Sequence, residues 1–90
     1  MLYLLEVTYP PENRDEIMKR RMDWEFPEGV AVHERLLVIG QHKMVVIADV
    51  PDVKALIEMT GPYTDLAVIN FSPVARWEDV KEDVKKEIGV

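Results

Sequence analysis

The stretch Val30–Val50, in the middle of this 90-residue chain, constrains the fold more than any other feature. It contains two runs rich in valine, isoleucine and leucine, and Gly40-Gln41 separates them. Apolar β-branched runs broken by a pair that contains glycine are typical of a β-hairpin. Glycine at the first turn position favours a type II′ turn, because it accepts a positive φ without a clash. We therefore predict two antiparallel strands joined by a two-residue turn.

Both faces of the predicted hairpin are largely apolar. With Gly40-Gln41 as the turn, one face carries His33, Arg35, Leu37, Ile39, His42, Met44, Val46 and Ala48, and the other carries Val32, Glu34, Leu36, Val38, Lys43, Val45, Ile47 and Asp49. A sheet with one face in water alternates apolar and polar residues more cleanly. Helices of the same chain cover one face, so we expect a second subunit to cover the other. The predicted homodimer buries the face with Leu37, Met44 and Val46, and Arg35 lies near its interface.

The other predicted elements place the hairpin in a βαββαβ order with an added C-terminal helix. They are a strand over Met1–Tyr9, a helix over Glu12–Trp24, a helix over Pro51–Thr60, a strand over Leu66–Phe71 and a helix over Trp77–Ile88. This order is typical of the ferredoxin-like α+β fold. We expect residues 1–90 to form a single domain with one four-stranded antiparallel sheet. The first and third strands should lie at its centre, with the first two helices on the same side.

Apolar stripes predict how the helices pack. In the second helix the core-facing stripe is expected to be Val53, Leu56, Ile57 and Thr60, and Gly61 is expected to cap its end. The C-terminal helix has a narrow stripe made of Trp77, Val80, Val84 and Ile88. An isolated helix of this length is marginal in water. We therefore expect it to dock, either on its own subunit or on the partner.

Composition limits the class of protein. The net charge of −6 opposes binding to nucleic acid or to anionic lipid, because both require lysine and arginine. The absence of cysteine excludes disulfides and zinc–thiolate sites. No apolar run reaches the ~18 residues of a membrane span, and the N-terminal stretch lacks the basic start of a signal peptide. We expect a cytoplasmic protein without a metal or cofactor.

Four polar residues are candidates for a ligand site. His33 and Arg35 are two residues apart on one predicted strand, which places them about 7 Å from each other. Together they could hold a carboxylate, with Arg35 as the fixed cation and His33 as a titratable partner. The alternative for Arg35 is a rim position beside an acid. Glu6 and Asn70 interrupt apolar strands, which is typical of a pocket or of a sheet edge. His42 lies about 20 Å from His33 in this register, so we predict no shared metal ion.

The opening MLYLLEVTYPPENRDEIMKR resembles that of a family of short bacterial and archaeal proteins of unknown function in the dimeric α+β barrel superfamily. Similar features are the turn Pro11–Glu16, the segment Pro27–Val30 before the second strand, Arg35, and Phe71–Val74 after the fourth strand. The resemblance covers about residues 1–75. The chain departs from it at Leu36-Leu37, where such proteins usually have Trp-His, and in a longer acidic C-terminal helix. No role of that histidine is carried over.

The resemblance implies a homodimeric barrel whose interior binds a small, partly apolar or carboxylated molecule. One alternative is a cofactor-free monooxygenase or isomerase in the same barrel, for which His33 is the only candidate base. The other is a structural or assembly dimer with a filled interior. Aromatic side chains such as Trp24 and Tyr63 are expected mainly in the core, with stacking on an aromatic ligand as the alternative. A cavity without a base would indicate binding, and a cavity touched by an ionisable group would indicate an enzyme.

Overall fold

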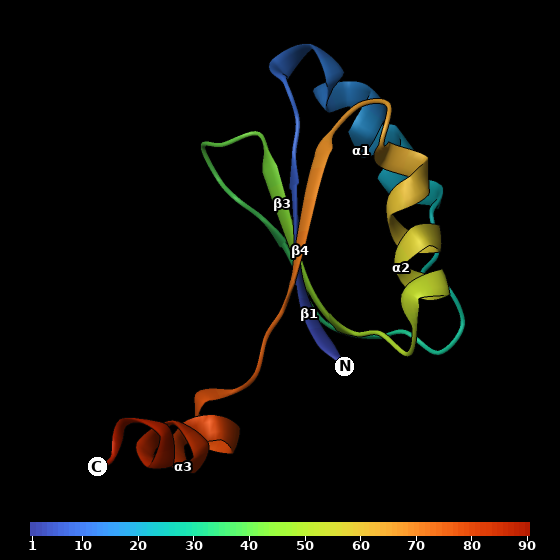
Figure 1. The fold of residues 1–90 in the computed structure, drawn as a ribbon. Helices are drawn as coiled ribbons and strands as arrows, with labels where there is room; N and C mark the ends of the chain where they lie inside the picture. The colour runs from blue at the N-terminus through green and yellow to red at the C-terminus, as the bar shows by residue number, and fades with distance from the viewer.

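The computed structural model describes residues 1–90, and its elements follow the predicted order. The strands are β1 (Leu2–Thr8), β2 (Ala31–Leu37), β3 (Lys43–Asp49) and β4 (Val68–Pro73), and the helices are α1 (Arg14–Asp23), α2 (Val53–Thr60) and α3 (Trp77–Ile88). Two short 3₁₀ turns, η1 (Pro11–Asn13) and η2 (Gly61–Tyr63), precede α1 and follow α2. The four strands form one antiparallel sheet in the order β2-β3-β1-β4. Figure 1 shows α1 and α2 on the same side of it. The ferredoxin-like α+β prediction is confirmed.

The β2–β3 hairpin keeps the predicted register near its loop but not the predicted turn. Leu37 pairs with Met44 and Arg35 pairs with Val46, as expected. However, the Gln41 N–H donates to the Val38 carbonyl at 3.3 Å, which makes Gly40, with a φ of 86°, the third residue of the turn. A positive φ at this position belongs to a type II turn, so the predicted two-residue type II′ turn is wrong.

A β-bulge at His33 changes the register further along β2. Val32, rather than His33, pairs with Ala48, while Glu34 still pairs with Ile47. His33 is the inserted residue, so two residues of β2 lie opposite one of β3. The predicted pair of His33 with Ala48 is therefore wrong. Face assignments that are counted from the turn by alternation do not reveal an inserted residue. Beyond each insertion, the residues assigned to one face lie on the other.

The face that α1 and α2 cover is the one predicted to meet a second subunit. All 11 buried residues lie between this face and the helices: Leu5, Val7, Tyr9, Ile17, Met44, Ala48, Val50, Ala55, Leu56, Met59 and Tyr63. The prediction that Met44, Val46 and Ala48 lie on the uncovered face is wrong. Both faces of the hairpin are apolar, so alternation separates two sets of residues without indicating which set the helices cover.

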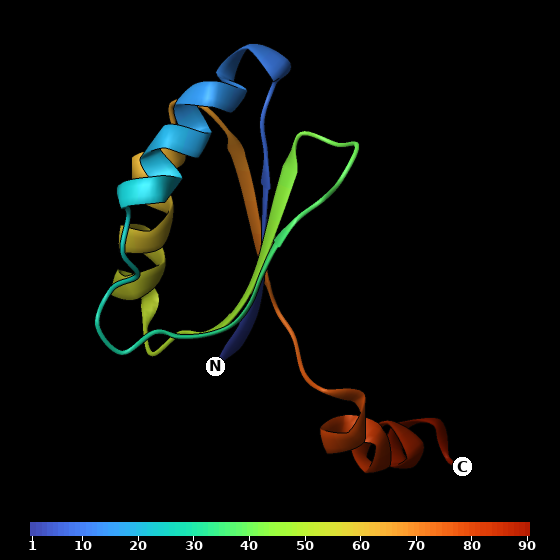
Figure 2. The same ribbon diagram turned by 180° about the vertical axis from the view of Figure 1, so that it is seen from behind.

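The other side of the sheet carries no helix over it (Figures 1 and 2). We call it the open face, and the strand registers assign to it Leu2, Leu4, Glu6, Thr8, Ala31, Glu34, Leu36, Lys43, Val45, Ile47, Asp49, Val68, Asn70 and Ser72. No residue of the open face is buried. Residues paired on adjacent strands form rows across this face. One row crosses all four strands and consists of Leu36, Val45, Glu6 and Asn70.

Helix α2 faces the sheet with a different stripe from the one predicted. Asp52 caps it, because its side chain accepts a hydrogen bond from the Ala55 N–H at 2.9 Å. Leu56 is buried, as predicted, but Val53 and Ile57 are 69% and 65% exposed. Ala55 and Met59 take their place, on the other flank of Leu56. Gly61 caps the end of α2, as predicted, with its N–H hydrogen-bonded to the Ile57 carbonyl, but its φ of −48° is right-handed and the chain continues into η2.

Helix α3 lies apart from the rest of the chain. Its bounds match the prediction, and Gly89, with a φ of 74°, caps its end. Figures 1 and 2 show it beyond the end of β4, on the open-face side of the sheet. None of its residues is buried, and the radius of gyration is 15.4 Å. A compact chain of this length would have a value of about 12 Å. The predicted docking on its own subunit is therefore not found.

Candidate functional site

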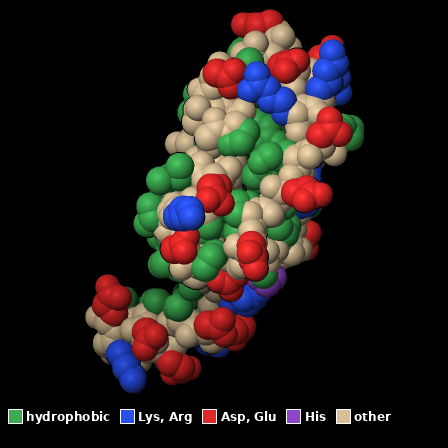
Figure 3. Space-filling view, turned by 90° about the vertical axis from the view of Figure 1, so that its right-hand side faces the viewer, with side chains coloured by type: hydrophobic (Ala, Val, Ile, Leu, Met, Phe, Trp, Pro, Cys, Tyr) green, Lys and Arg blue, Asp and Glu red, His purple; other side chains and the backbone are tan.

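A small cavity lies between the helices and the sheet. It has a volume of about 40 Å³, and Leu5, Val7, Met44 and Val46 form its apolar floor on β1 and β3. Figure 3 looks onto this side of the molecule, where hydrophobic side chains reach the surface among scattered charged ones. Two more open hollows, at the hairpin loop and at the start of α2, have no comparable pair of cations beside aromatic rings. We therefore take the cavity between helices and sheet as the candidate site.

Two arginines line the cavity without an acidic partner. Arg21 comes from the last turn of α1 and Arg35 from β2. The Arg21 Nη1 lies 2.8 Å from the Met44 sulfur, and the Arg35 guanidinium lies 5.1 Å from the centre of the Phe26 ring. None of the ion pairs of the chain includes either arginine. In a protein with a net charge of −6, two unpaired cations at an apolar cavity are suited to an anion.

Aromatic rings complete the wall of the cavity. Trp24 makes edge contacts with Phe26 and Tyr63, with ring centres 4.6 Å and 5.9 Å apart. Burial raises the pKa of the Tyr63 hydroxyl above its ordinary value, and the guanidinium groups of Arg21, Arg35 and Arg20 oppose that rise. The hydroxyl therefore stays protonated at neutral pH. A protonated phenol beside two guanidinium groups is a hydrogen-bond donor for the same anion.

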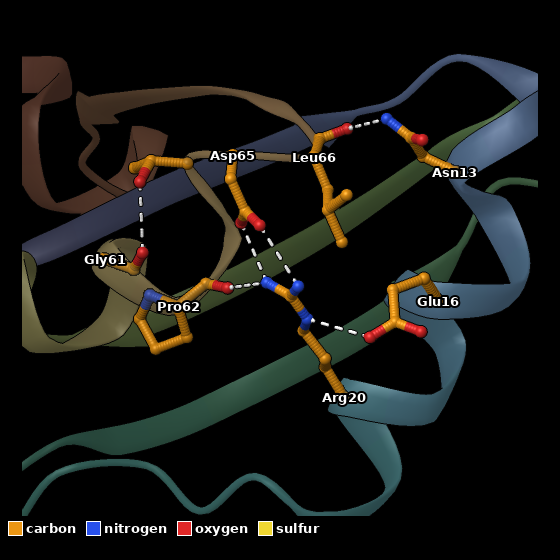
Figure 4. A network of polar contacts seen from close by, with 8 residues as sticks. Asn13, Glu16, Arg20, Gly61, Pro62, Asp65 and Leu66 are labelled. Carbon is orange, nitrogen blue, oxygen red and sulfur yellow. Dashed lines mark hydrogen bonds and ion pairs between the residues drawn. The ribbon is translucent and has the colours of Figure 1, made fainter.

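A network of polar contacts joins the N-terminal turn and α1 to the segment of residues 61–66 (Figure 4). The Arg20 guanidinium donates to both carboxylate oxygens of Asp65, at 2.8 and 3.1 Å, and to the Pro62 carbonyl at 2.7 Å. The Asn13 side chain donates to the Leu66 carbonyl at 3.0 Å. These bonds join α1, which carries Arg21, to the segment that carries Tyr63. The network thus sets the position of one part of the cavity wall relative to another.

The Arg20–Asp65 pair makes this network sensitive to acid. The hydrogen bonds from Arg20 hold the pKa of the Asp65 carboxyl below its ordinary value of 3.8. A lowered folded-state pKa means that the stabilisation is complete above the ordinary pKa and is lost as the pH falls through the lowered one. We expect Asp65→Asn to lose less thermal stability than the wild type between neutral pH and about pH 2. Asp83→Asn, an exposed change on α3, should keep the wild-type response, and an Asp65→Asn protein with that same response would contradict the prediction.

The four residues predicted for the ligand site do not come together. Arg35 lines the cavity on the helix side. Glu6 and Asn70 pair directly across β1 and β4 on the open face, where Glu6 also forms an ion pair with Lys43. His33 is exposed at the bulge and does not line the cavity. The cavity therefore contains only Arg35 of the predicted His33–Arg35 pair.

Sequence reasoning missed the partners of Arg35. Arg21 lies four residues after the buried Ile17 and three before Trp24, so it is a cation within an apolar helical stripe. That position was a usable signal for a charged group at a pocket. Tyr63, after Gly61-Pro62, carried no comparable signal, because its place depends on the contacts of η2 with α1.

Two further properties of the chain bear on its function. The structure contains no group of three or more histidine, aspartate or glutamate side chains arranged to hold a metal ion. Its helices are all too short or too polar to cross a membrane.

Comparison with known proteins identifies a family but no activity. The sequence profile described as a domain of unknown function (DUF3303) matches residues 1–88. No curated protein matches the chain. The match confirms the expected kinship with an uncharacterised domain family, whereas the dimeric α+β barrel superfamily stays a prediction.

Proposed function

The chain belongs to the DUF3303 family, a domain of unknown function, and we propose from its own residues that it binds a small, partly apolar carboxylate. The observation that carries this proposal is the pair of arginines without acidic partners at an apolar cavity. Arg21 and Arg35 would hold the carboxylate, and the Tyr63 hydroxyl would donate a hydrogen bond to it. Guanidinium groups suit this role because their donors match the geometry of a carboxylate.

The size of the cavity limits the ligand. A buried water needs roughly 10–15 Å³ of such volume, so a cavity of about 40 Å³ admits only a few heavy atoms. The pockets of drug-sized ligands are about 300–1,000 Å³. The proposed ligand is therefore a carboxylate with a tail of a few carbons, whose apolar end lies between Trp24 and the floor of the cavity.

The ionisable groups at the cavity favour binding over catalysis. A guanidinium group donates hydrogen bonds and has no acceptor, and the pKa of Tyr63 is raised by burial. None of the three is a base at neutral pH. His33, the only candidate base for an isomerase or monooxygenase, is not at the cavity. The enzyme alternative thus has no residue to abstract a proton at this site.

Calorimetric titration with butyrate tests the binding proposal, with butyramide as a neutral ligand of the same shape. We expect butyrate to bind the wild type and butyramide not to bind measurably. Arg35→Gln and Arg21→Gln should each weaken butyrate binding about 10- to 100-fold, because a hydrogen bond to a charged group contributes about 1.5–3 kcal/mol. Arg14→Gln, a change at an exposed arginine paired with Asp15, should leave the affinity unchanged.

Three outcomes would overturn the carboxylate proposal. Equal binding of butyrate and butyramide would show that the arginines do not hold the charge. Inorganic phosphate binding as tightly as butyrate would show that the apolar floor contributes nothing. No heat of binding up to millimolar butyrate would remove the proposal altogether.

We also propose that the protein is a homodimer that associates through the open face. The supporting observation is that none of the 11 buried residues lies on that face, although Leu4, Val45 and Ile47 are at its centre. Soluble monomers seldom expose a contiguous apolar patch larger than a few hundred Å². Two sheets packed face to face would form the dimeric α+β barrel that the sequence resemblance implies. Glu6 and Asn70 would then lie at the interface, with Glu6 paired to Lys43.

A further inference from the structure

Helix α3 and the open face are two unpartnered apolar surfaces of the same chain. Trp77 and Ile88, at the ends of the α3 stripe, are 57% and 66% exposed. Charged residues occupy the other sides of the helix, so the stripe is its only surface suited to packing. We propose that each subunit of the dimer extends α3 as an arm that packs this stripe on the outer part of the partner's open face. The inference rests on the proposed dimer.

The direction of the chain after β4 supports an arm rather than a helix that folds back. The Val74 N–H still donates to the Leu2 carbonyl at 2.9 Å, and Arg76 is extended, with φ −70° and ψ 134°. Only Ala75 and Arg76 lie between that bond and the helix, so three Cα–Cα steps take the chain at most about 11 Å from Val74 to the start of α3. This short, extended connection carries α3 beyond the end of β4, where none of its residues is buried against its own subunit (Figures 1 and 2).

The small extent of the open face favours an occupant that adds contact area, and a second copy with an α3 arm does so. Four strands of about seven residues cover about 23 Å by 19 Å, or ~440 Å² in projection. A stable interface usually buries about 800 Å² of accessible surface on each partner. An α3 arm about 18 Å long and about 10 Å wide adds ~180 Å² in projection. The open face and α3 lie on the same side of the sheet (Figures 1 and 2), so each arm extends toward the side on which the partner of the proposed dimer would lie.

Fluorescence of Trp77 reports where α3 lies. Trp24 is the only other tryptophan, so the difference between the wild type and Trp77→Phe isolates the Trp77 emission. We expect this emission to shift to shorter wavelength, and to become several-fold less sensitive to acrylamide, over the same concentration range in which light scattering detects dimer. The double variant Val80→Asn/Val84→Asn should keep Trp77 exposed at all concentrations and should raise the dissociation constant at least tenfold.

A matched control distinguishes the loss of the apolar stripe from a general loss of helix α3. Glu82→Asn/Lys86→Asn introduces the same residue on the opposite side of α3 without changing the net charge. Valine and asparagine have similar helix propensities, so circular dichroism should show that α3 persists in the stripe variant. The control should dimerise as the wild type does. A control that dissociates equally would overturn the assignment of the stripe.

The possible failures of the arm and of the dimer are distinguishable. A dimer in which Trp77 stays exposed would overturn the arm and leave the open-face dimer standing. Trp77 shielded equally in dilute monomer would overturn the arm, because the helix would be packing on its own subunit. A wild type that stays at 10.4 kDa at all concentrations would overturn both the dimer and the arm.

Discussion

Replacement of Ile47 by aspartate should convert the proposed dimer into a folded monomer. Ile47 lies on β3 between Leu4 and Glu34, at the centre of the open face. In a two-fold dimer the change places two unpaired carboxylates in one interface. Breaking the pairing of a buried charge costs about 3–5 kcal/mol, so the dissociation constant should rise at least ~100-fold. Light scattering at micromolar concentration should then give a mass near 10.4 kDa for the variant and twice that for the wild type.

The adjacent residue is the matched control, because neighbours in a strand point to opposite faces. Ala48 is 0% exposed and lies under the helices. Ala48→Asp should therefore unfold the subunit instead of dissociating it, with loss of the cooperative thermal transition. Val46, which pairs with Arg35 on the same side, is a poorer control because an aspartate there would find a cation. An Ile47→Asp protein that stays dimeric would show that the open face has another role.

Replacement of Ile17 by alanine should lower the free energy of unfolding by about 2–5 kcal/mol. Ile17 is 0% exposed and packs with Val7, Tyr9 and Met44, which join α1 to both central strands. The loss combines the transfer of apolar atoms with the cavity left behind. Small domains have a total stability of about 5–15 kcal/mol, so a large part of it depends on this side chain. Urea unfolding should show the midpoint moving down with little change in slope.

The control for Ile17 lies on the same helix. Met22 is 81% exposed, and Met22→Ala should change the free energy of unfolding by less than about 0.5 kcal/mol. If the two variants lost equal stability, α1 would not be anchored through Ile17. Butyrate titration of Ile17→Ala should also show weaker binding, because Met44 contacts both this cluster and the Arg21 side chain.

The order of elements and most of the helix and strand bounds were predictable from local patterns. β-Branched runs, apolar helical stripes, prolines and the acidic start and basic end of α3 each depend on neighbours a few residues away. The same locality explains why Leu37 was correctly paired with Met44: register close to a turn is set by the turn. The loop itself tolerated the difference between a two-residue turn and a longer one, because both bring the same residues opposite each other.

Which face of the sheet the helices cover was decided only by tertiary packing. The two faces of the hairpin have similar hydrophobicity, so the choice depends on the shapes of Ile17, Leu56 and Met59 against the sheet. The bulge at His33 also depends on residues far away in the sequence. An extra residue fits into a strand only where the neighbouring strand and the local twist of the sheet accommodate it. The candidate site follows from both decisions. Arg35 was identifiable as a candidate ligand cation from its strand position, but its place beside Arg21 and Tyr63 at the cavity required the packing of α1 and η2 over that face.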